Sequence, residues 1–216
     1  MKTSIRTHEG RVALVTGAAQ GIGQAIAVAL AERGAQVIAT DLTPPHGTVD
    51  RIGPAAHAFQ LDVTQEEDWR SVWVKSRDVG DVDIVVNNAG YFPNRSIDEL
   101  DLPTWRKTMA TNLDAQFLSS KYFLPAMRKK KWGRFIGISS NMVGLAIPGM
   151  SHYITTKMGI IGFMRGLAMM LQTMASPQTR SYLVSPIHWQ SHLNRKSKNG
   201  SPGSSKPSSG WENPRT

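Results

Sequence analysis

The chain contains no cysteine, and this absence excludes several kinds of chemistry. A protein without thiols has no disulfide framework, no thiolate metal site and no cysteine nucleophile. Residues 1–11 are polar and show no apolar stretch before a cleavage site, so we expect no signal peptide. Together these two features favour a cytoplasmic protein.

Long apolar runs and metal-ligand patterns are missing as well. No apolar run approaches the ~18–20 residues that a membrane-spanning helix needs, so we expect no membrane partner. The six histidines do not show the spacing of metal ligands. We therefore expect no bound metal.

Acidic residues are scarce near the C-terminus, and most of the net charge of +9 comes from there. Residues 169–216 hold six Lys or Arg and one acid, Glu212, which leaves +4 for the first 168 residues. Residues 128–131 form the basic cluster of that first part. We interpret it as a helix C-terminus, where cations suit the helix dipole, and a phosphate-binding patch is the alternative. We expect no nucleic-acid partner, although a tail that binds nucleic acid or protein is an alternative.

Strand-like and helical segments alternate along the first 168 residues. We expect strands at residues 12–15, 37–41, 57–61, 82–86 and 134–138, and helices at 22–33, 65–78, 103–127 and 152–171. This alternation predicts an α/β fold, a doubly wound parallel sheet of the Rossmann type with helices on both faces. Polar or glycine residues follow every strand, and in such sheets ligands bind at the carboxyl ends of the strands.

A glycine-rich segment follows the first strand, with Gly17, Gly21 and Gly23 spaced as Gly-x-x-x-Gly-x-Gly. Glycines allow a sharp turn and a close approach of the backbone to a pyrophosphate, whose charge sits at a helix N-terminus. An ordinary tight turn is the alternative for this pattern alone. Its position between a strand and a helix favours dinucleotide binding.

Two acidic residues end the second and third strands. Asp41 can accept hydrogen bonds from the adenosine ribose hydroxyls and repel a 2′-phosphate, which favours NAD over NADP. The alternative is that Asp41 only starts the turn before Pro44. Asp62 suits either the adenine amino group or a helix-capping role before Glu66.

Tyr153, Lys157 and Ser140 form a set that can move a proton. Oxidation of an alcohol by hydride transfer needs a base for the hydroxyl proton, and a free tyrosine, with a pKa near 10, is a poor base at neutral pH. Lys157 lies one helical turn from Tyr153 and can stabilise its phenolate. Ser140 can hold the substrate oxygen in place. An amphipathic helix without chemistry is the alternative for the Tyr-x-x-x-Lys spacing alone.

These motifs, in this order, resemble the short-chain dehydrogenase/reductase family over residues 11 to about 168. The match comprises Thr16-Gly17-x-x-x-Gly21-x-Gly23, Asn87-Asn88-Ala89-Gly90, Asn112, Ser140 and Tyr153-x-x-x-Lys157. The resemblance implies a secondary alcohol or ketone substrate, with secondary-alcohol dehydrogenases and 3-oxoacyl-thioester reductases as the nearest subgroups. It also implies a homo-oligomer through the helices at 103–127 and 152–171.

The resemblance further assigns roles to individual residues. It implies that Lys157 holds the nicotinamide ribose and that Asn112 anchors a proton-relay water, so that Asn112, Ser140, Tyr153 and Lys157 are the catalytic set. The cofactor set that it implies, Tyr153 and Lys157 included, contains Gly17, Gln20, Gly21, Ile22, Gly23, Asp41, Asp62, Val63, Asn88, Ala89 and Gly90. The side chains of Tyr91, Phe92, Leu145, Ile147 and Met150 are candidates for an apolar substrate wall.

The resemblance ends near Ala168. The family continues with a sixth strand, a Pro-Gly turn and a seventh strand, and we expect none of these in residues 169–216. Val184-Ser185-Pro186 is followed by Ile187 where the family has glycine. Lys, Ser, Gly, Pro and Asn dominate after Ser191, so we expect the last ~25 residues to be a disordered tail.

We interpret this change of composition as the result of a frameshift, which is a hypothesis. Reading from one base earlier, permitted codons from Ala168 to Leu183 encode N-D-V-A-D-D-G-I-T-A-N-A-I-L-P, which resembles the family's sixth strand and Pro-Gly turn. In the same frame, residues 205–214 permit Q-A-I-K-R-L-G-E-P, a segment found before the family's last helix. We therefore expect a domain at 1–168, truncated at the sheet edge beside strand 134–138, and impaired turnover. The alternative is an inactive remnant that at most binds nucleotide.

Overall fold

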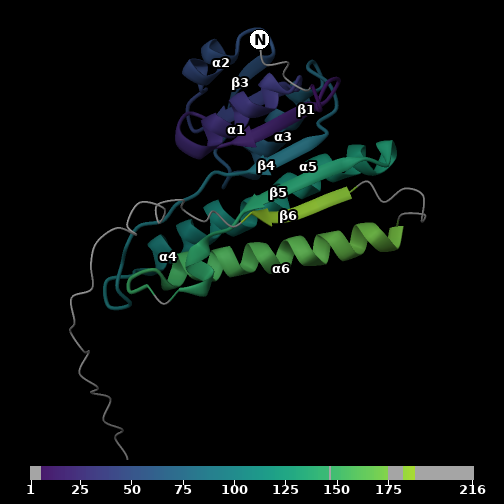
Figure 1. Cartoon of the computed structure of the whole chain (residues 1–216). Helices are drawn as coiled ribbons and strands as arrows, with labels where there is room; N and C mark the ends of the chain where they lie inside the picture. Colours follow the sequence, from purple (N-terminus) through teal and green to yellow (C-terminus); the bar gives the residue numbers. More distant parts are fainter. Residues whose placement is uncertain (1–5, 146, 175–181, 188–216) are drawn as a thin grey trace, which may run out of the picture.

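A single parallel sheet organises the chain, and helices lie on both of its faces (Figure 1). The structure is a computed structural model that describes residues 6–145, 147–174 and 182–187. The strand order is β3-β2-β1-β4-β5-β6, so the order reverses beside β1. The strands are β1 (Val12–Thr16), β2 (Gln36–Asp41), β3 (Ala56–Gln60), β4 (Ile84–Asn87), β5 (Gly133–Ile138) and β6 (Tyr182–Ile187). The doubly wound α/β fold expected from the sequence is confirmed.

The helices divide into two layers, each with its own core. On one face, α1 (Gly21–Glu32) and α2 (His46–Ile52) pack on alanine and valine side chains of the central strands. On the other face, α3 (Glu66–Ser76), α5 (Ala115–Lys130) and α6 (Ser151–Met174) cover a core of larger side chains that includes Trp69 and Phe135. All five residues of β1 are buried, as expected for a strand covered on both faces.

The helix expected at residues 103–127 is three consecutive segments. These are α4 (Leu102–Met109), a π-helical turn (Ala110–Asp114) and α5. Asp101 caps α4 by accepting a hydrogen bond from the backbone N–H of Thr104 at 2.8 Å. Single π-turns inside helices are frequent at functional sites, and this one contains Asn112.

The second difference from the sequence prediction is β6, because no strand was expected after Ala168. Residues Tyr182–Ile187 pair in parallel with the whole of β5, from Gly133 to Ile138. We expected the edge of β5 to be uncovered, and for the described residues this prediction is wrong because β6 covers that edge. The apolar run is short and contains Pro186, which lacks a backbone donor, but the last strand of a sheet tolerates such a residue.

Helix α6 also differs from the expectation that no segment is apolar enough to span a membrane. Its residues Ser151–Leu171 are long and apolar enough to cross a membrane, by length and composition only, with a mean hydropathy of 1.2. The helix contains no uninterrupted apolar run of that length, because serine, threonine and glycine lie between its apolar residues. One side of α6, with Ile160, Met164 and Leu171, belongs to the core against the sheet. A helix that packs in a protein core can have the same length and hydropathy as a membrane-spanning helix.

Candidate functional site

A pocket of about 500 Å³ lies at the carboxyl ends of the strands, next to the point where the strand order reverses. The loops after β1, β2 and β4 meet there with the first turns of α6. Most of the residues expected to bind a dinucleotide or to react line it: Gly17, Gln20, Gly21, Ile22, Asp41, Asn88, Ala89, Gly90, Tyr153 and Lys157. Gly23, Asp62, Val63, Asn112 and Ser140 are outside this lining.

The glycine loop is closely packed, which explains two of its glycines. Gly17 has φ of +65°, and a Cβ there would lie 2.9 Å from the Cα of Ala89. A Cβ on Gly23 would collide with the carbonyl oxygen of Gly17 and come within 2.5 Å of the Asn88 side chain. Helix α1 then begins at Gly21 with no side-chain cap, so its first N–H groups can receive an anion.

Asn88 ties the loop after β4 to the loop after β1. Its Nδ2 donates to the carbonyl oxygens of Thr16 at 3.0 Å and Gly17 at 3.1 Å. The Thr16 hydroxyl in turn accepts from the backbone N–H of Ala89 at 3.0 Å. These bonds hold one wall of the pocket against the glycine loop.

Asp41 presents its carboxylate at the pocket from the end of β2. Its Oδ2 accepts from the backbone N–H of Ala19 at 2.9 Å, and its Oδ1 accepts from that of Leu42 at 2.9 Å. Each oxygen keeps a further lone pair. The carboxylate is thus held in place by backbone donors and can still accept from hydroxyl groups.

Asp62 and Val63 lie outside the pocket lining, and both make local hydrogen bonds. The Oδ1 of Asp62 accepts from the backbone N–H of Thr64 at 2.9 Å and from its hydroxyl at 2.8 Å. The residue that precedes α3 as its N-cap is Gln65, so Asp62 does not cap that helix directly. Val63 is buried, and its carbonyl accepts from Trp69 Nε1 at 2.9 Å. The carboxylate of Asp62 therefore shapes the turn after β3.

Tyr153 and Lys157 lie in the first turns of α6 and face the same pocket. The Lys157 Nζ is 5.3 Å from the centroid of the Tyr153 ring and donates to the Ile138 carbonyl at 2.7 Å. Burial lowers the pKa of Lys157 from 10.5 to about 8, because desolvation disfavours the charged form. Phe92 meets the Tyr153 ring edge-on at 6.1 Å.

Ser140 follows β5 and is buried beside the pocket. Its hydroxyl accepts from the backbone N–H of Met142 at 3.2 Å and so begins the short 3-10 helix Asn141–Gly144. The preceding Ser139 donates to the carbonyl of Lys157 at 3.0 Å. The end of β5 and the first turns of α6 are therefore joined directly.

Asn112 is fully buried in the π-helical turn, and its side chain connects the loop after β4 with α6. Its Oδ1 accepts from the backbone N–H of Tyr91 at 2.7 Å. Its Nδ2 donates to the Tyr91 carbonyl at 2.9 Å and to the Thr156 hydroxyl at 3.1 Å. Since both side-chain donors are taken, Asn112 can offer a water only acceptors, either the second lone pair of Oδ1 or the backbone carbonyl.

Some residues of the site were not predicted as such. Thr156 joins Asn112 to α6 by donating to the Tyr153 carbonyl at 2.7 Å, and its place inside the Tyr-x-x-x-Lys segment was the available signal. Leu42 and Ile138 line the pocket because they adjoin strand ends. Of the proposed apolar wall, Phe92 lines the pocket, whereas Met150 is buried.

Comparison with known proteins agrees with this geometry. The sequence profile of the short-chain dehydrogenase family matches residues 11–197. The 3-oxoacyl-(acyl-carrier-protein) reductase FabG of Escherichia coli (strain K12) is 40% identical over 163 residues, which are 74% of this chain and 67% of FabG. FabG of Aquifex aeolicus (strain VF5) is 34% identical over 167 residues, again 74% of this chain and 67% of the relative.

A solved structure shows the same architecture. The crystal structure of a protein described as a short-chain alcohol dehydrogenase, from Sinorhizobium meliloti 1021, superposes with a TM-score of 0.74 at 35% identity. The superposition covers 79% of this chain and 70% of that chain. The chain therefore belongs to the short-chain dehydrogenase family and is an oxidoreductase of that family, homologous to the FabG ketoreductases.

Proposed function

We propose that the protein interconverts a secondary alcohol and a ketone with NAD(H). The observation that carries this proposal is one pocket that contains both a glycine loop at the start of α1 and the Tyr153–Lys157 pair. The loop can hold a dinucleotide at one end, and the pair can exchange a proton at the other. The bound dinucleotide supplies or accepts the hydride.

The side chains of the chain divide the remaining work. Tyr153 donates its phenolic proton to the ketone oxygen during reduction and takes it back during oxidation. Lys157, when protonated, stabilises the phenolate and can hold the ribose of the cofactor. Ser140 hydrogen-bonds the substrate oxygen and orients it toward Tyr153. The Asn112 carbonyl would hold a relay water that passes a proton from solvent to Tyr153 after reduction and from Tyr153 to solvent after oxidation.

Asp41 supports a preference for NAD over NADP. Its carboxylate faces the pocket, and a 2′-phosphate on the adenosine ribose would meet this negative charge. The one lysine or arginine among the described lining residues is Lys157, beside Tyr153. No described cation of the lining therefore stands next to Asp41 to neutralise such a phosphate.

The test is calorimetric titration with NAD and NADP, followed by a turnover assay. Ketones of different size, including a 3-oxoacyl thioester, are offered with NADH, and loss of its absorbance is recorded. The expected result is NAD binding and turnover that Tyr153→Phe abolishes. NAD binding without any turnover would favour the inactive remnant, and no binding at all would overturn the proposal. A cytoplasmic location remains a prediction that fractionation can test.

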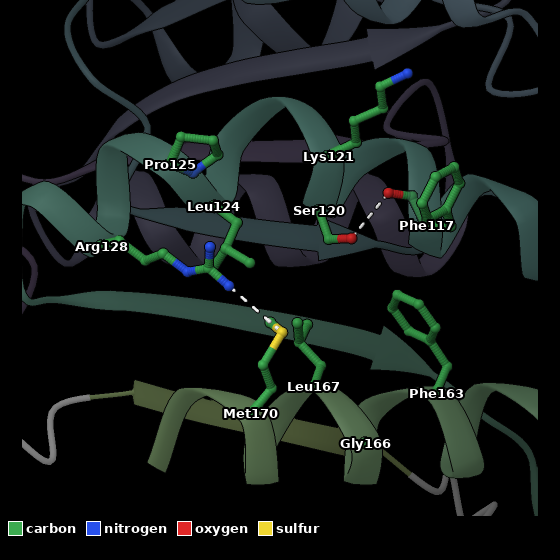
Figure 2. A pocket seen from close by; sticks show the side chains of 10 residues that line it. All are labelled: Phe117, Ser120, Lys121, Leu124, Pro125, Arg128, Phe163, Gly166, Leu167 and Met170. Carbon is green, nitrogen blue, oxygen red and sulfur yellow. Dashed lines mark hydrogen bonds between the residues drawn. The ribbon is translucent and has the colours of Figure 1, made fainter. Parts of the chain in front are cut away.

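We also propose that the protein pairs with a second copy of itself through α5 and α6. A groove of about 470 Å³ lies between these helices. Its lining side chains are mostly apolar (Figure 2). Phe117 is 54% exposed there, and the Arg128 guanidinium donates to the Met170 sulfur at 3.4 Å. Only 33% of the apolar segment Ser151–Leu171 is buried, so much of α6 offers apolar surface to a partner.

Sedimentation of matched variants tests this pairing. Phe117→Glu places a charge in the groove without opening the core, and we expect it to dissociate the oligomer. Val74→Glu is the control, since Val74 is 52% exposed on α3 and does not line the groove. A monomeric wild type, or equal masses for both variants, would contradict the proposal.

The frameshift after Ala168 is a further part of the proposal, with impaired turnover as its consequence. It is supported by the two family-like segments that appear in one alternative frame. Two observations count against it: β6 pairs with β5, and the family match extends to residue 197. Except for β6, residues 175–216 lie outside the described structure.

Resequencing the gene across the codons for residues 166–171 tests the frameshift directly. An extra base would restore the family's C-terminal half, whereas the present frame would make this chain the true product. A chain with the restored frame is also the positive control for turnover. We expect it to turn over ketone much faster than the chain as written, and equal rates would remove the proposed impairment.

A further inference from the structure

The loop after β4 is fastened to the start of α6 by hydrogen bonds that end on backbone carbonyls. His152 Nε2 donates to the Pro93 carbonyl oxygen at 2.9 Å. The backbone N–H of Arg95 donates to the Gly149 carbonyl oxygen at 2.9 Å. Residues 93–95 therefore take their position from the segment at the beginning of α6, although the two segments are far apart in the chain.

Gly149 lets these two segments approach each other closely. Its φ is +76°, and a Cβ there would collide with the Asn94 side chain. Glycine is the residue that accepts both the positive φ and the close contact. The backbone of Gly149 thus fixes one end of the junction, and His152 fixes the other.

His152 is fully buried in this junction. Its Nδ1 has no hydrogen-bond partner among the described residues. Because the Pro93 carbonyl can only accept, Nε2 carries the hydrogen and Nδ1 is the bare acceptor of the neutral ring. A buried acceptor without a donor is unfavourable, so an apolar side chain would suit the position better if it only filled space. The Nε2 donor is therefore the property that distinguishes histidine at this position.

The Pro93 carbonyl lies next to Phe92, whose aromatic ring meets that of Tyr153. The two ring centroids are 6.1 Å apart, and the ring planes are inclined by 63°. Phe92 lines the pocket beside Tyr153, yet it is 64% exposed. Proline restricts the backbone at residue 93, so the bond from His152 also limits where Phe92 can move. Much of an apolar ring therefore stays uncovered beside the group that would exchange a proton with the substrate.

We propose that Phe92 is a specificity-determining residue that contacts a large apolar substituent of the ketone, and that His152 is the positioning residue that holds Phe92 there. Besides Tyr153, Phe92 is the one aromatic residue among the described residues that line the pocket. An uncovered apolar ring gains free energy when an apolar group of the substrate covers it. The substrate contact rests on the proposed function, whereas the hold of His152 on Phe92 does not.

Two ketones that differ by one phenyl ring test the role of Phe92. Butanone and benzylacetone share the reacting methyl ketone, and benzylacetone adds the apolar ring, so the wild type should have the higher kcat/KM for benzylacetone with NADH. Phe92→Ala should raise KM for benzylacetone about tenfold or more with little change in kcat, because the lost contact is equal in the ground state and the transition state. For butanone we expect less than about a threefold change. An equal loss for both ketones, or no loss for benzylacetone, would overturn the specificity role.

A matched pair of variants tests the role of His152. Glutamine and methionine have similar length and volume, but only the glutamine amide can donate to the Pro93 carbonyl. His152→Met should therefore raise KM for benzylacetone about tenfold, and His152→Gln should change it by less than about threefold. In the Phe92→Ala background, His152→Met should add less than about twofold, because His152 acts through Phe92. An equal loss in the two His152 variants, or the full loss again in that background, would refute the positioning role.

Thr155→Val is the control for a general effect on the start of α6. Thr155 is exposed and donates within the helix, to the Ser151 carbonyl at 2.8 Å, so it has no bond to the loop after β4. We expect its KM for both ketones to match that of the wild type. A rise as large as that of His152→Met would show that any change at the start of α6 has this effect, and the positioning role would fail.

Nuclear magnetic resonance gives a readout that needs no turnover. The wild type should show a nuclear Overhauser effect between the rings of Phe92 and Tyr153, and His152 should carry its hydrogen on Nε2. His152→Gln should keep the ring contact and His152→Met should lose it, with His152→Leu in its place if the methionine variant does not fold. A hydrogen on Nδ1 alone, or the same ring contact in all variants, would overturn the positioning role. If no ketone is turned over while the ring contact behaves as expected, the proposed function fails and the hold of His152 on Phe92 stands.

Discussion

Replacing Lys157 by methionine should remove a pH dependence of stability. In the wild type the free energy of unfolding should rise between about pH 8 and pH 10.5, and in the variant this rise should be absent. Lys157 is 4% exposed, and its burial lowers its pKa from 10.5 to about 8. Each unit of difference between the folded and unfolded pKa corresponds to about 1.4 kcal/mol. The buried ammonium therefore costs about 3 kcal/mol of folding free energy below pH 8.

The sign of the pH dependence follows from which state loses the proton first. Below about pH 8 both states hold it, so the cost of burial is fully present. Between about pH 8 and pH 10.5 the unfolded chain binds more protons than the folded one, so the free energy of unfolding rises with pH. Lys157→Met has no such group and lacks this rise.

The assay is urea unfolding of the wild type and Lys157→Met at about pH 7 and about pH 11. The wild type should gain about 3 kcal/mol relative to the variant between these two conditions. The variant corrects for the other lysines and tyrosines, which titrate in both proteins. The same pH dependence in the two proteins would show that Lys157 titrates alike when folded and unfolded, and the reasoning would fail.

Four further changes probe the site. Asp41→Asn should lower the preference for NADH over NADPH by about tenfold or more, as the ratio of dissociation constants reports. Gly23→Ala should abolish NAD binding in calorimetry, since its Cβ would collide with the glycine loop; retained affinity would contradict that packing. Tyr153→Phe should reduce kcat by about 10²–10⁴-fold without weakening NADH binding. In the wild type, kcat/KM for ketone reduction should fall as pH rises through about 8, because neutral Lys157 no longer stabilises the phenolate. A kcat/KM that does not change with pH in this range would exclude this role of Lys157.

The parallel sheet and the family could both be predicted from the sequence alone. The alternation of short apolar runs with helical segments was sufficient for β1 to β5, because strands buried on both faces need apolar residues throughout. The glycine spacing and Tyr153-x-x-x-Lys157 identified the two ends of the pocket, since those residue types are needed locally by backbone geometry and proton transfer.

Other features depend on residues that are far apart in the chain, and these features could not be predicted before the fold was known. The π-helical turn around Asn112 could not be predicted from local propensity, because its side chain is held by Tyr91 and Thr156. The strand β6 forms through pairing with β5, although its own sequence is a weak strand signal. The depressed pKa of Lys157 and the buried position of His152 likewise arise from burial, and only packing creates burial.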